Sequence, residues 1–337
     1  MYNAADLDKQ IKLPVDEKLV EQLFDIYING RKSNSAEKIN GVIRQIRFML
    51  IDDEPTTKEE KIKNIEKQLY NRLQVRGVSS YTKQAESQID VLRAAFDWSA
   101  YMDAKQEGIS RTEYYDDAYE LMGWYCCPAS RSKEKSHKNK HRLYFNVCGV
   151  NRWKLANILY HKLKKSGKPF SFKVLTDSAM NRVDGLVWYI RSDCLQQSLR
   201  IVDDIIRENP ELLKDSKASP IMGQMYGGRV GYGAELPYKG YSYSSLVCTV
   251  FAETLFAGIE NYQIPGKPKY SGLDQFDQYV KDYVKDKGFI SAFTRNFRRK
   301  LQGIGLDPDN MCFNPEEMKK IKDHNNQMLN NFNRGRE

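Results

Sequence analysis

The first strand-like pattern in the chain is RLYFNV, at residues 142–147. Its apolar residues alternate with Arg142, Tyr144 and Asn146, so the apolar set takes one face of an extended segment and these three take the other. Helical periodicity dominates before this stretch, and strands alternate with helices after it. That order predicts an α+β protein, in which a helical N-terminal region is followed by a mixed sheet flanked by helices.

Two further strand patterns follow the first. FSFKV at 170–174 places its two phenylalanines and its valine inward and Lys173 on the opposite face. LVWYI at 186–190 is apolar on both faces, which is typical of a central strand. Amphipathic helices are expected at 152–165, between the first two strands, and at 194–208, after the third.

The first third of the chain has the apolar periodicity of helices. TKEE at 57–60 has the form of a capping box. A further helix is expected over 113–125, and the segment that follows is basic, polar and free of aliphatic residues. This organisation predicts a helical N-terminal region at 1–130, a basic loop or linker at 131–141 and an α+β domain at 142–337.

Composition excludes several classes of protein. The 337 residues include 53 Lys+Arg and 44 Asp+Glu, and 41% are hydrophobic, which supports a core. No apolar run approaches the roughly 20 residues of a membrane span, and the first residues lack the layout of a secretory signal. We therefore expect a cytoplasmic protein with no membrane partner.

The cysteines and histidines lack metal-ligand spacing, so no metal is expected. Short basic runs such as 295–300 are interpreted as solvated faces, so no nucleic acid is expected either.

Five side chains are candidates for a site, because strand phase or loop position keeps them out of the core. Arg142 and Tyr144 share a strand face, and Lys173 points away from the core of the next strand. Arg182 lies in a polar loop, and Arg229 lies among glycines, which let backbone N–H groups approach a ligand. Several cations in one cleft suit a phosphate. Spacing alone leaves open that they are solvated surface charges. The glycine stretch at 227–233 matches neither nucleotide-binding loop, so turn-forming glycines in a loop are expected there.

Residues 142–259 contain a succession of short motifs: FSFKVL at 170–175, RVDGLVWYI at 182–190, Pro220, GYGAELP at 231–237, SYS at 242–244, Cys248 and Glu253. This succession resembles the HopA family, which comprises type III secretion effectors and the lyase components of class V lanthipeptide synthetases. The same segment is more distantly similar to the bacterial phosphothreonine lyases, which use a basic residue and a histidine acid on one strand and a lysine base in a KVTD element.

The resemblance implies a phosphothreonine-lyase-like fold and roles for the five candidates. Lys173 is the implied base and Tyr144 the implied acid, and the implied phosphate ligands are Arg142, Arg182 and Arg229. The implied reaction is β-elimination of phosphate from phosphoserine or phosphothreonine in a precursor peptide, which gives dehydroalanine or dehydrobutyrine during lanthipeptide biosynthesis without a cofactor. The expected partners are that phosphorylated peptide, a separate kinase and, as a further candidate, a cyclase, since the chain has no kinase signature.

A lysine base must be neutral part of the time, so we expect burial and the nearby arginines to lower the pKa of Lys173. Two departures from the family patterns stand out. Tyr144 replaces the histidine of the lyases, which leaves the acid open, since His141 is expected on the other strand face. Val247 stands where the HopA pattern has arginine. The alternatives are a HopA-like type III effector that acts by protein binding without catalysis, and a basic nucleic-acid-binding protein.

Overall fold

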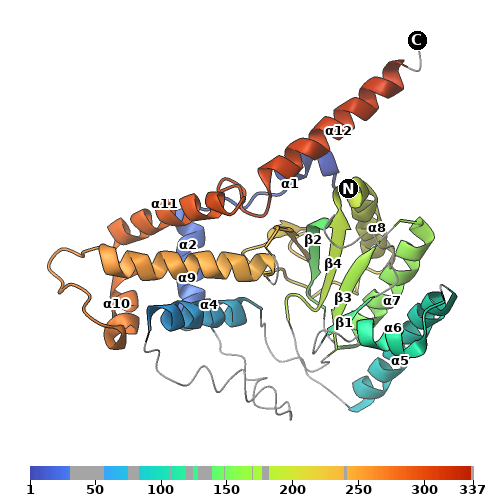
Figure 1. The fold of residues 1–337 in the computed structure, drawn as a ribbon, viewed down its shortest axis with the longest axis horizontal. Coiled ribbons are helices and arrows are strands. Elements are labelled where there is room, and N and C mark those ends of the chain that lie inside the picture. Colours follow the sequence, from blue (N-terminus) through green and yellow to red (C-terminus); the bar gives the residue numbers. More distant parts are fainter. Residues whose placement is uncertain are drawn as a thin grey trace. The chain divides into compact units, whose positions relative to one another are not determined.

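The structure is a computed structural model, and its fold is drawn in Figure 1. It describes residues 1–30, 57–74, 83–106, 108–118, 124–127, 139–147, 149–168, 170–176, 182–238 and 241–334. The chain divides into two compact units, and each is described by itself. Unit 1 comprises 1–12, 76–237 and 312–337, and unit 2 comprises 13–75 and 238–311.

Unit 1 is built on a six-stranded sheet in the order β1-β3-β4-β2-β6-β5 (Figure 1). Every pairing is antiparallel, so the α+β prediction is confirmed but the sheet is not mixed. The reason is that β2 and β3 run in the same direction but β4 lies between them and runs against both. The strands are β1 (Trp124–Cys126), β2 (Asn139–Phe145), β3 (Ser171–Leu175), β4 (Leu186–Arg191), β5 (Gly223–Met225) and β6 (Val230–Ala234).

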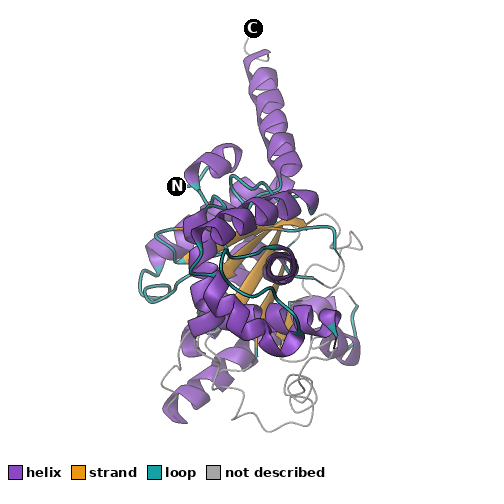
Figure 2. Ribbon diagram, turned by 90° about the vertical axis from the view of Figure 1, so that its left-hand side faces the viewer, coloured by secondary structure: helices purple, strands orange, loops and turns teal. Residues whose placement is uncertain are grey.

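Helices pack on one face of this sheet, which we call the helix face. Phe96 of α5 packs against Tyr125 of β1, Phe172 of β3 and Trp153 of α7, with ring centroids 5.1–5.9 Å apart. Helix α8 lies against β4, and Figure 2 gives a second view of the helices and the sheet. The helices of unit 1 are η1 (Ala4–Asp6), α1 (Leu7–Gln10), α5 (Lys83–Gln106), α6 (Arg111–Ala118), α7 (Gly149–Ser166), η4 (Ser192–Cys194), α8 (Leu195–Glu208) and α12 (Pro315–Arg334).

The predicted helix over 113–125 is wrong at its C-terminal end. Helix α6 ends at Ala118, and 124–126 form β1, the edge strand beside β3. The compact units also differ from the predicted boundaries at 130 and 141, because α5, α6 and β1 pack with α7 and β3. Of the predicted linker, 131–138 lies outside the described residues, and 139–141 belongs to β2.

The glycine-rich stretch is not a simple loop, since β5 and β6 pair across a tight turn within it. Tyr226, Gly227 and Gly228 in this turn have positive φ angles of 53°, 69° and 84°, a conformation that favours glycine. In β6, a Cβ on Gly231 would lie only 2.8 Å from the Met222 sulfur. Glycine is therefore needed in the turn for its backbone conformation, and in β6 because the Met222 side chain packs directly against the backbone of Gly231.

Unit 2 is helical, and α9 is its most deeply buried helix. Phe251 of α9 packs against Phe24 and Phe293 at ring-centroid distances of 5.1 and 5.2 Å. The predicted capping box is confirmed, since Thr57 and Glu60 exchange two side chain–backbone hydrogen bonds of 3.2 Å. None of the described helices is long and apolar enough to cross a membrane. The helices of unit 2 are α2 (Glu17–Asn29), α4 (Lys58–Gln74), α9 (Tyr243–Asn261), η5 (Leu273–Gln275), α10 (Phe276–Tyr283) and α11 (Lys287–Gly303).

Candidate active site

Three of the predicted site residues lie on the sheet face opposite the helix face, which we call the site face. Strand register pairs Lys173 of β3 with Val187 of β4, and Val187 with Tyr144 of β2. Directly paired residues share a face, so these three form one row across the sheet. Because neighbouring strands are about 4.8 Å apart, the backbones at Lys173 and Tyr144 are about 10 Å apart. Arg142 lies on the same face, two residues before Tyr144 on β2.

The Lys173 amine lies in a half-buried aromatic and ionic environment. Its Nζ is 4.1 Å from the centroid of the Trp124 ring on β1. Burial lowers the pKa of Lys173, and the positive charges of Arg142 and Arg182 act in the same direction, while the Asp184 carboxylate opposes them. The net pKa is below the ordinary value of a lysine, so the neutral amine is populated at lower pH than in solvent.

Arg142 is buried and is held by a carboxylate. Its Nε and Nη2 both donate to Glu235, which follows β6, and the Nη2–Oε1 distance is 2.6 Å. The guanidinium also lies over the Tyr189 ring of β4, 4.9 Å from its centroid. Burial alone would lower the pKa of Arg142, but Tyr144 and the Glu235 carboxylate raise it above the ordinary value. This guanidinium therefore stays charged.

Arg182 is held in a similar way by Asp184, in the turn before β4. Its Nε and Nη2 donate to the two carboxylate oxygens at 2.8 and 3.0 Å. Asp184 is buried, which alone would raise its pKa, but Arg182 and Lys173 lower it below the ordinary value. The Arg182 guanidinium carbon is 6.0 Å from the centroid of the Trp124 ring. The Trp124 indole therefore has two cations beside it, Lys173 from β3 and Arg182 from this turn.

Tyr144 presents a buried phenol on the site face. Its hydroxyl makes no hydrogen bond of normal geometry within the described residues, although the Arg142 charge acts on it. Burial raises the pKa of Tyr144 well above the ordinary value, so the phenol stays protonated and can donate. His141 lies on the helix face, as predicted, where its Nδ1 is 2.7 Å from the Tyr232 hydroxyl. Burial lowers the pKa of His141 to about 4, so this ring is neutral.

Arg229 lies beside the strand that carries Arg142 and Tyr144, but away from the strand of Lys173. It lies in the β5–β6 turn, two residues before Gly231, the β6 partner of Tyr144. Strand β6 is three positions from β3 in the sheet, about 14 Å at ordinary strand spacing. Its guanidinium has no ion-pair partner in the part of the chain that the structure describes. The structure thus brings Lys173, Arg142, Tyr144 and Arg182 together, and it places Arg229 in the turn before β6, three strands from Lys173.

Four residues of this site have roles that the sequence analysis missed. Trp124 was assigned to a helix and Cys126 to no element, although the register places Cys126 directly beside Lys173. Asp184 and Glu235 stood within the quoted motifs without a role, and each proves to hold one arginine. An acidic residue within two positions of an arginine was the available signal for Asp184. Glu235 is 93 residues from Arg142, and no local signal links them.

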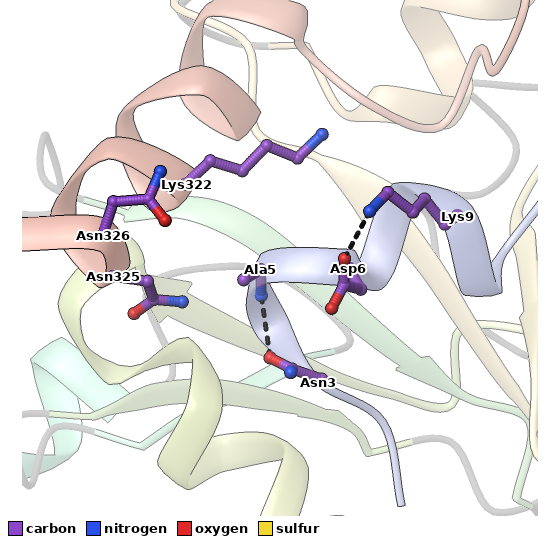
Figure 3. Close-up of a pocket in the computed structure, with 7 residues that line it drawn as sticks. All are labelled: Asn3, Ala5, Asp6, Lys9, Lys322, Asn325 and Asn326. Atoms are coloured by element: carbon purple, nitrogen blue, oxygen red, sulfur yellow. Dashed lines mark hydrogen bonds and ion pairs between the residues drawn. The ribbon is translucent and has the colours of Figure 1, made fainter. Parts of the chain in front are cut away.

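A cavity of about 650 Å³ in unit 1 lies away from these residues, between the N-terminal segment and α12 (Figure 3). Its two lysines already have acidic partners, because Lys9 pairs with Asp6 and Lys322 pairs with Asp8. Within the described ranges, no group of three His, Cys, Asp or Glu side chains is arranged to hold a metal ion. The residues that line the cavity are Asn3, Ala5, Asp6, Lys9, Lys322, Asn325 and Asn326.

Comparison with known proteins gives one family match. A model of the HopA1 effector protein family matches residues 122–313, more than half of the chain, and this span contains all five candidate residues. Two solved structures are similar, the effector proteins from Pseudomonas syringae pv. syringae strain 61 and from Pseudomonas syringae pv. tomato strain DC3000. They are 13% and 14% identical in sequence, and each has a TM-score of 0.48. The matches cover 89% and 88% of this chain and 99% of each of those chains. No curated protein matches.

Proposed function

Because the chain belongs to the HopA1 effector protein family, and its motifs resemble those of the lyase components within the wider HopA family, we propose that it is a phosphoserine/phosphothreonine lyase. It eliminates phosphate from a precursor peptide during lanthipeptide biosynthesis and leaves dehydroalanine or dehydrobutyrine. The observation that carries the proposal is Lys173, a half-buried amine with a lowered pKa that is influenced by two arginines. A larger fraction of such an amine is neutral, and so able to accept a proton, than of an ordinary surface lysine at the same pH.

The proposed reaction uses side chains on the site face. Lys173 takes the proton from the Cα of the phosphorylated residue, and the C–H electron pair becomes the Cα–Cβ double bond. The Cβ–O bond breaks and its electron pair leaves on the phosphate oxygen. Tyr144, which its raised pKa keeps protonated, gives its hydroxyl proton to that oxygen, and hydrogen phosphate leaves. The proton that Lys173 took from Cα then returns to the Tyr144 oxygen through water, which restores both side chains.

The two paired arginines supply the positive field for the leaving phosphate. Arg142 uses Nε and Nη2 for Glu235, which fixes the plane of the guanidinium and leaves Nη1 to donate to a ligand. Asp184 fixes the plane of Arg182 in the same manner. Donors held in fixed directions stabilise developing charge without having to reorganise. A separate kinase must add the phosphate beforehand, and a cyclase is a further candidate partner.

The test distinguishes elimination from hydrolysis by mass. A phosphothreonine peptide incubated with the protein should lose H3PO4, whereas a phosphatase would remove only HPO3. Lys173→Ala should abolish the loss while the far-UV circular dichroism of the protein stays unchanged. Lys154→Ala is the matched control, because Lys154 is an exposed lysine on α7. Full activity in Lys173→Ala would assign the base elsewhere.

A second function is favoured by one observation. Each of the two arginines near Lys173 already has a bidentate carboxylate partner, and Arg142 and Tyr144 are 7% and 3% exposed. A buried network of this kind also occurs as a purely structural feature. That is the expectation for a HopA-like effector that binds a protein without catalysis. An unchanged phosphopeptide mass, measured with the folded wild-type protein over a range of pH, would favour this second function.

A further inference from the structure

One fully buried charge on α7 has no role in the reaction above. Arg152 is 0% exposed, yet it lies only three residues after the start of the helix. Its Nε donates to the Val147 carbonyl at 3.1 Å, and its Nη1 donates to the Leu175 carbonyl at 3.0 Å. Burying a guanidinium is costly unless its donors are satisfied, and these two carbonyls are among the partners that hold it inside the fold.

The two carbonyls belong to the strands that carry the candidate base and acid. Leu175 ends β3, two residues after Lys173. Val147 follows β2, three residues after Tyr144. A single planar side chain therefore spans the ends of two strands that are not neighbours, because β4 lies between them in the sheet.

The turn that leads into β4 is fixed at the same point. The Leu175 N–H donates to the Gly185 carbonyl at 2.9 Å, and the Gly185 N–H donates to the Arg182 carbonyl at 3.2 Å. A Cβ on Gly185 would lie 2.3 Å from the Val147 oxygen and 3.2 Å from the Arg152 Nε. Glycine is thus required there, because the turn that carries Arg182 passes directly against both groups.

We propose that Arg152 is a positioning residue, which fixes the ends of β2 and β3 and the turn before β4 relative to one another. The side chains that these segments carry, Tyr144, Lys173 and Arg182, depend on that junction for their mutual distances. In a well-aligned site, a displacement of about 1 Å costs about 100-fold in rate. The catalytic consequence rests on the proposed function, whereas the positioning itself does not.

The experiment compares three variants. Arg152→Met keeps an unbranched apolar stem but removes the guanidinium with all its donors. Arg152→Lys keeps the charge with a single donor group, and Lys154→Met is an exposed control on the same helix. With a phosphothreonine peptide, Arg152→Met should lower kcat about 100-fold and change KM by only a few-fold. Arg152→Lys should recover part of the rate, and Lys154→Met should match the wild type.

A second readout does not need lyase activity. The pH dependence with which acetic anhydride acetylates Lys173, followed by peptide mass spectrometry, reports the protonation of this amine. In the wild type Lys173 should react at lower pH than exposed lysines, because burial and the arginines lower its pKa. Arg152→Met should move this reaction toward the pH of ordinary lysines as the junction loosens and water enters.

Each outcome decides something. If Arg152→Met lowers the melting temperature but leaves kcat and the acetylation profile of Lys173 unchanged, Arg152 only supports the fold and the proposal is wrong. If the wild type has no lyase activity but the acetylation profile shifts as expected, the proposed function fails and the positioning role stands. If Arg152→Met does not fold, Arg152→Lys decides by the same two measurements, with an unchanged profile counting against the proposal.

Discussion

Asp184→Asn removes one charge from a buried ion pair and changes almost nothing in shape. Asp184 accepts both Nε and Nη2 of Arg182, at 2.8 and 3.0 Å, and its side chain is only 7% exposed. Removing one partner of a buried pair costs about 3–5 kcal/mol. Asparagine keeps one uncharged acceptor and the Arg182 side chain is 18% exposed, so we expect a loss of about 2 kcal/mol at pH 7.

The loss should depend on pH in a fixed direction. Burial raises the pKa of Asp184, but Arg182 and Lys173 act against it and the net pKa is lowered, so the folded-state pKa is below the unfolded value of about 3.9. The stabilisation is therefore complete above the unfolded-state pKa and disappears as the pH falls through the folded-state value. Wild type and Asp184→Asn should differ fully at pH 7 and converge in acid.

The assay is urea unfolding followed by tryptophan fluorescence. All four tryptophans, at positions 98, 124, 153 and 188, lie in unit 1, so the signal reports the unit that contains Asp184. At about 2 kcal/mol per molar urea, the midpoint should fall by about 1 M. Asp193→Asn is the matched control. Asp193 accepts two donors from Arg191, also two residues away, but its side chain is 56% exposed, so the loss should be below about 1 kcal/mol. Equal midpoints for Asp184→Asn and Asp193→Asn would refute the reasoning.

Three further substitutions have defined outcomes. Lys173→Met should raise the urea midpoint at pH 7. Burial and Arg142 lower the folded-state pKa of Lys173, so the wild type gains stability as the pH rises toward the pKa that Lys173 has in the unfolded chain. The variant should lack this increase of stability with pH. Tyr144→Phe should leave the free energy of unfolding within about 1 kcal/mol of wild type, since the buried hydroxyl has no hydrogen-bond partner within the described residues. The same variant should lower kcat about 100-fold if Tyr144 is the acid. Gly231→Ala should lower the melting temperature by the equivalent of about 1–3 kcal/mol, because the new methyl group would lie 2.8 Å from the Met222 sulfur; an unchanged temperature would contradict the tight packing.

Local patterns were sufficient to predict which side chains share a face. The alternation in 142–147 places Tyr144 on one face and His141 on the other, because a strand repeats every two residues, and the structure has both where the pattern puts them. Strand β1 was missed because three residues give too short an alternation to separate from the end of a helix. Glycines in β6 resemble a loop until the packing against Met222 is known.

The ion-pair partners depend on contacts that no local pattern encodes. Glu235 and Arg142 are 93 residues apart in the sequence, and they meet only because β6 pairs with β2. From the sequence we therefore expected a group of cations without carboxylate partners around the Lys173 amine. The structure instead places a carboxylate beside each of the two arginines that act on Lys173. The strand faces of Arg142, Tyr144 and Lys173 could thus be predicted from the sequence, whereas the carboxylates that balance the arginines could not.

The interleaving of the two units has a consequence for the order in which the polypeptide can mature on the ribosome. Unit 1 draws on three separate segments, and the last of these begins at 312. Domains generally fold as whole units while synthesis proceeds from the N-terminus. Although all the described strands of the sheet have been made by residue 234, Phe313, whose ring packs against Tyr232 of β6 at a centroid distance of 4.7 Å, is among the last parts of unit 1 to be made. A nascent chain that stops short of 312 therefore carries all the candidate site residues and still lacks a complete unit 1.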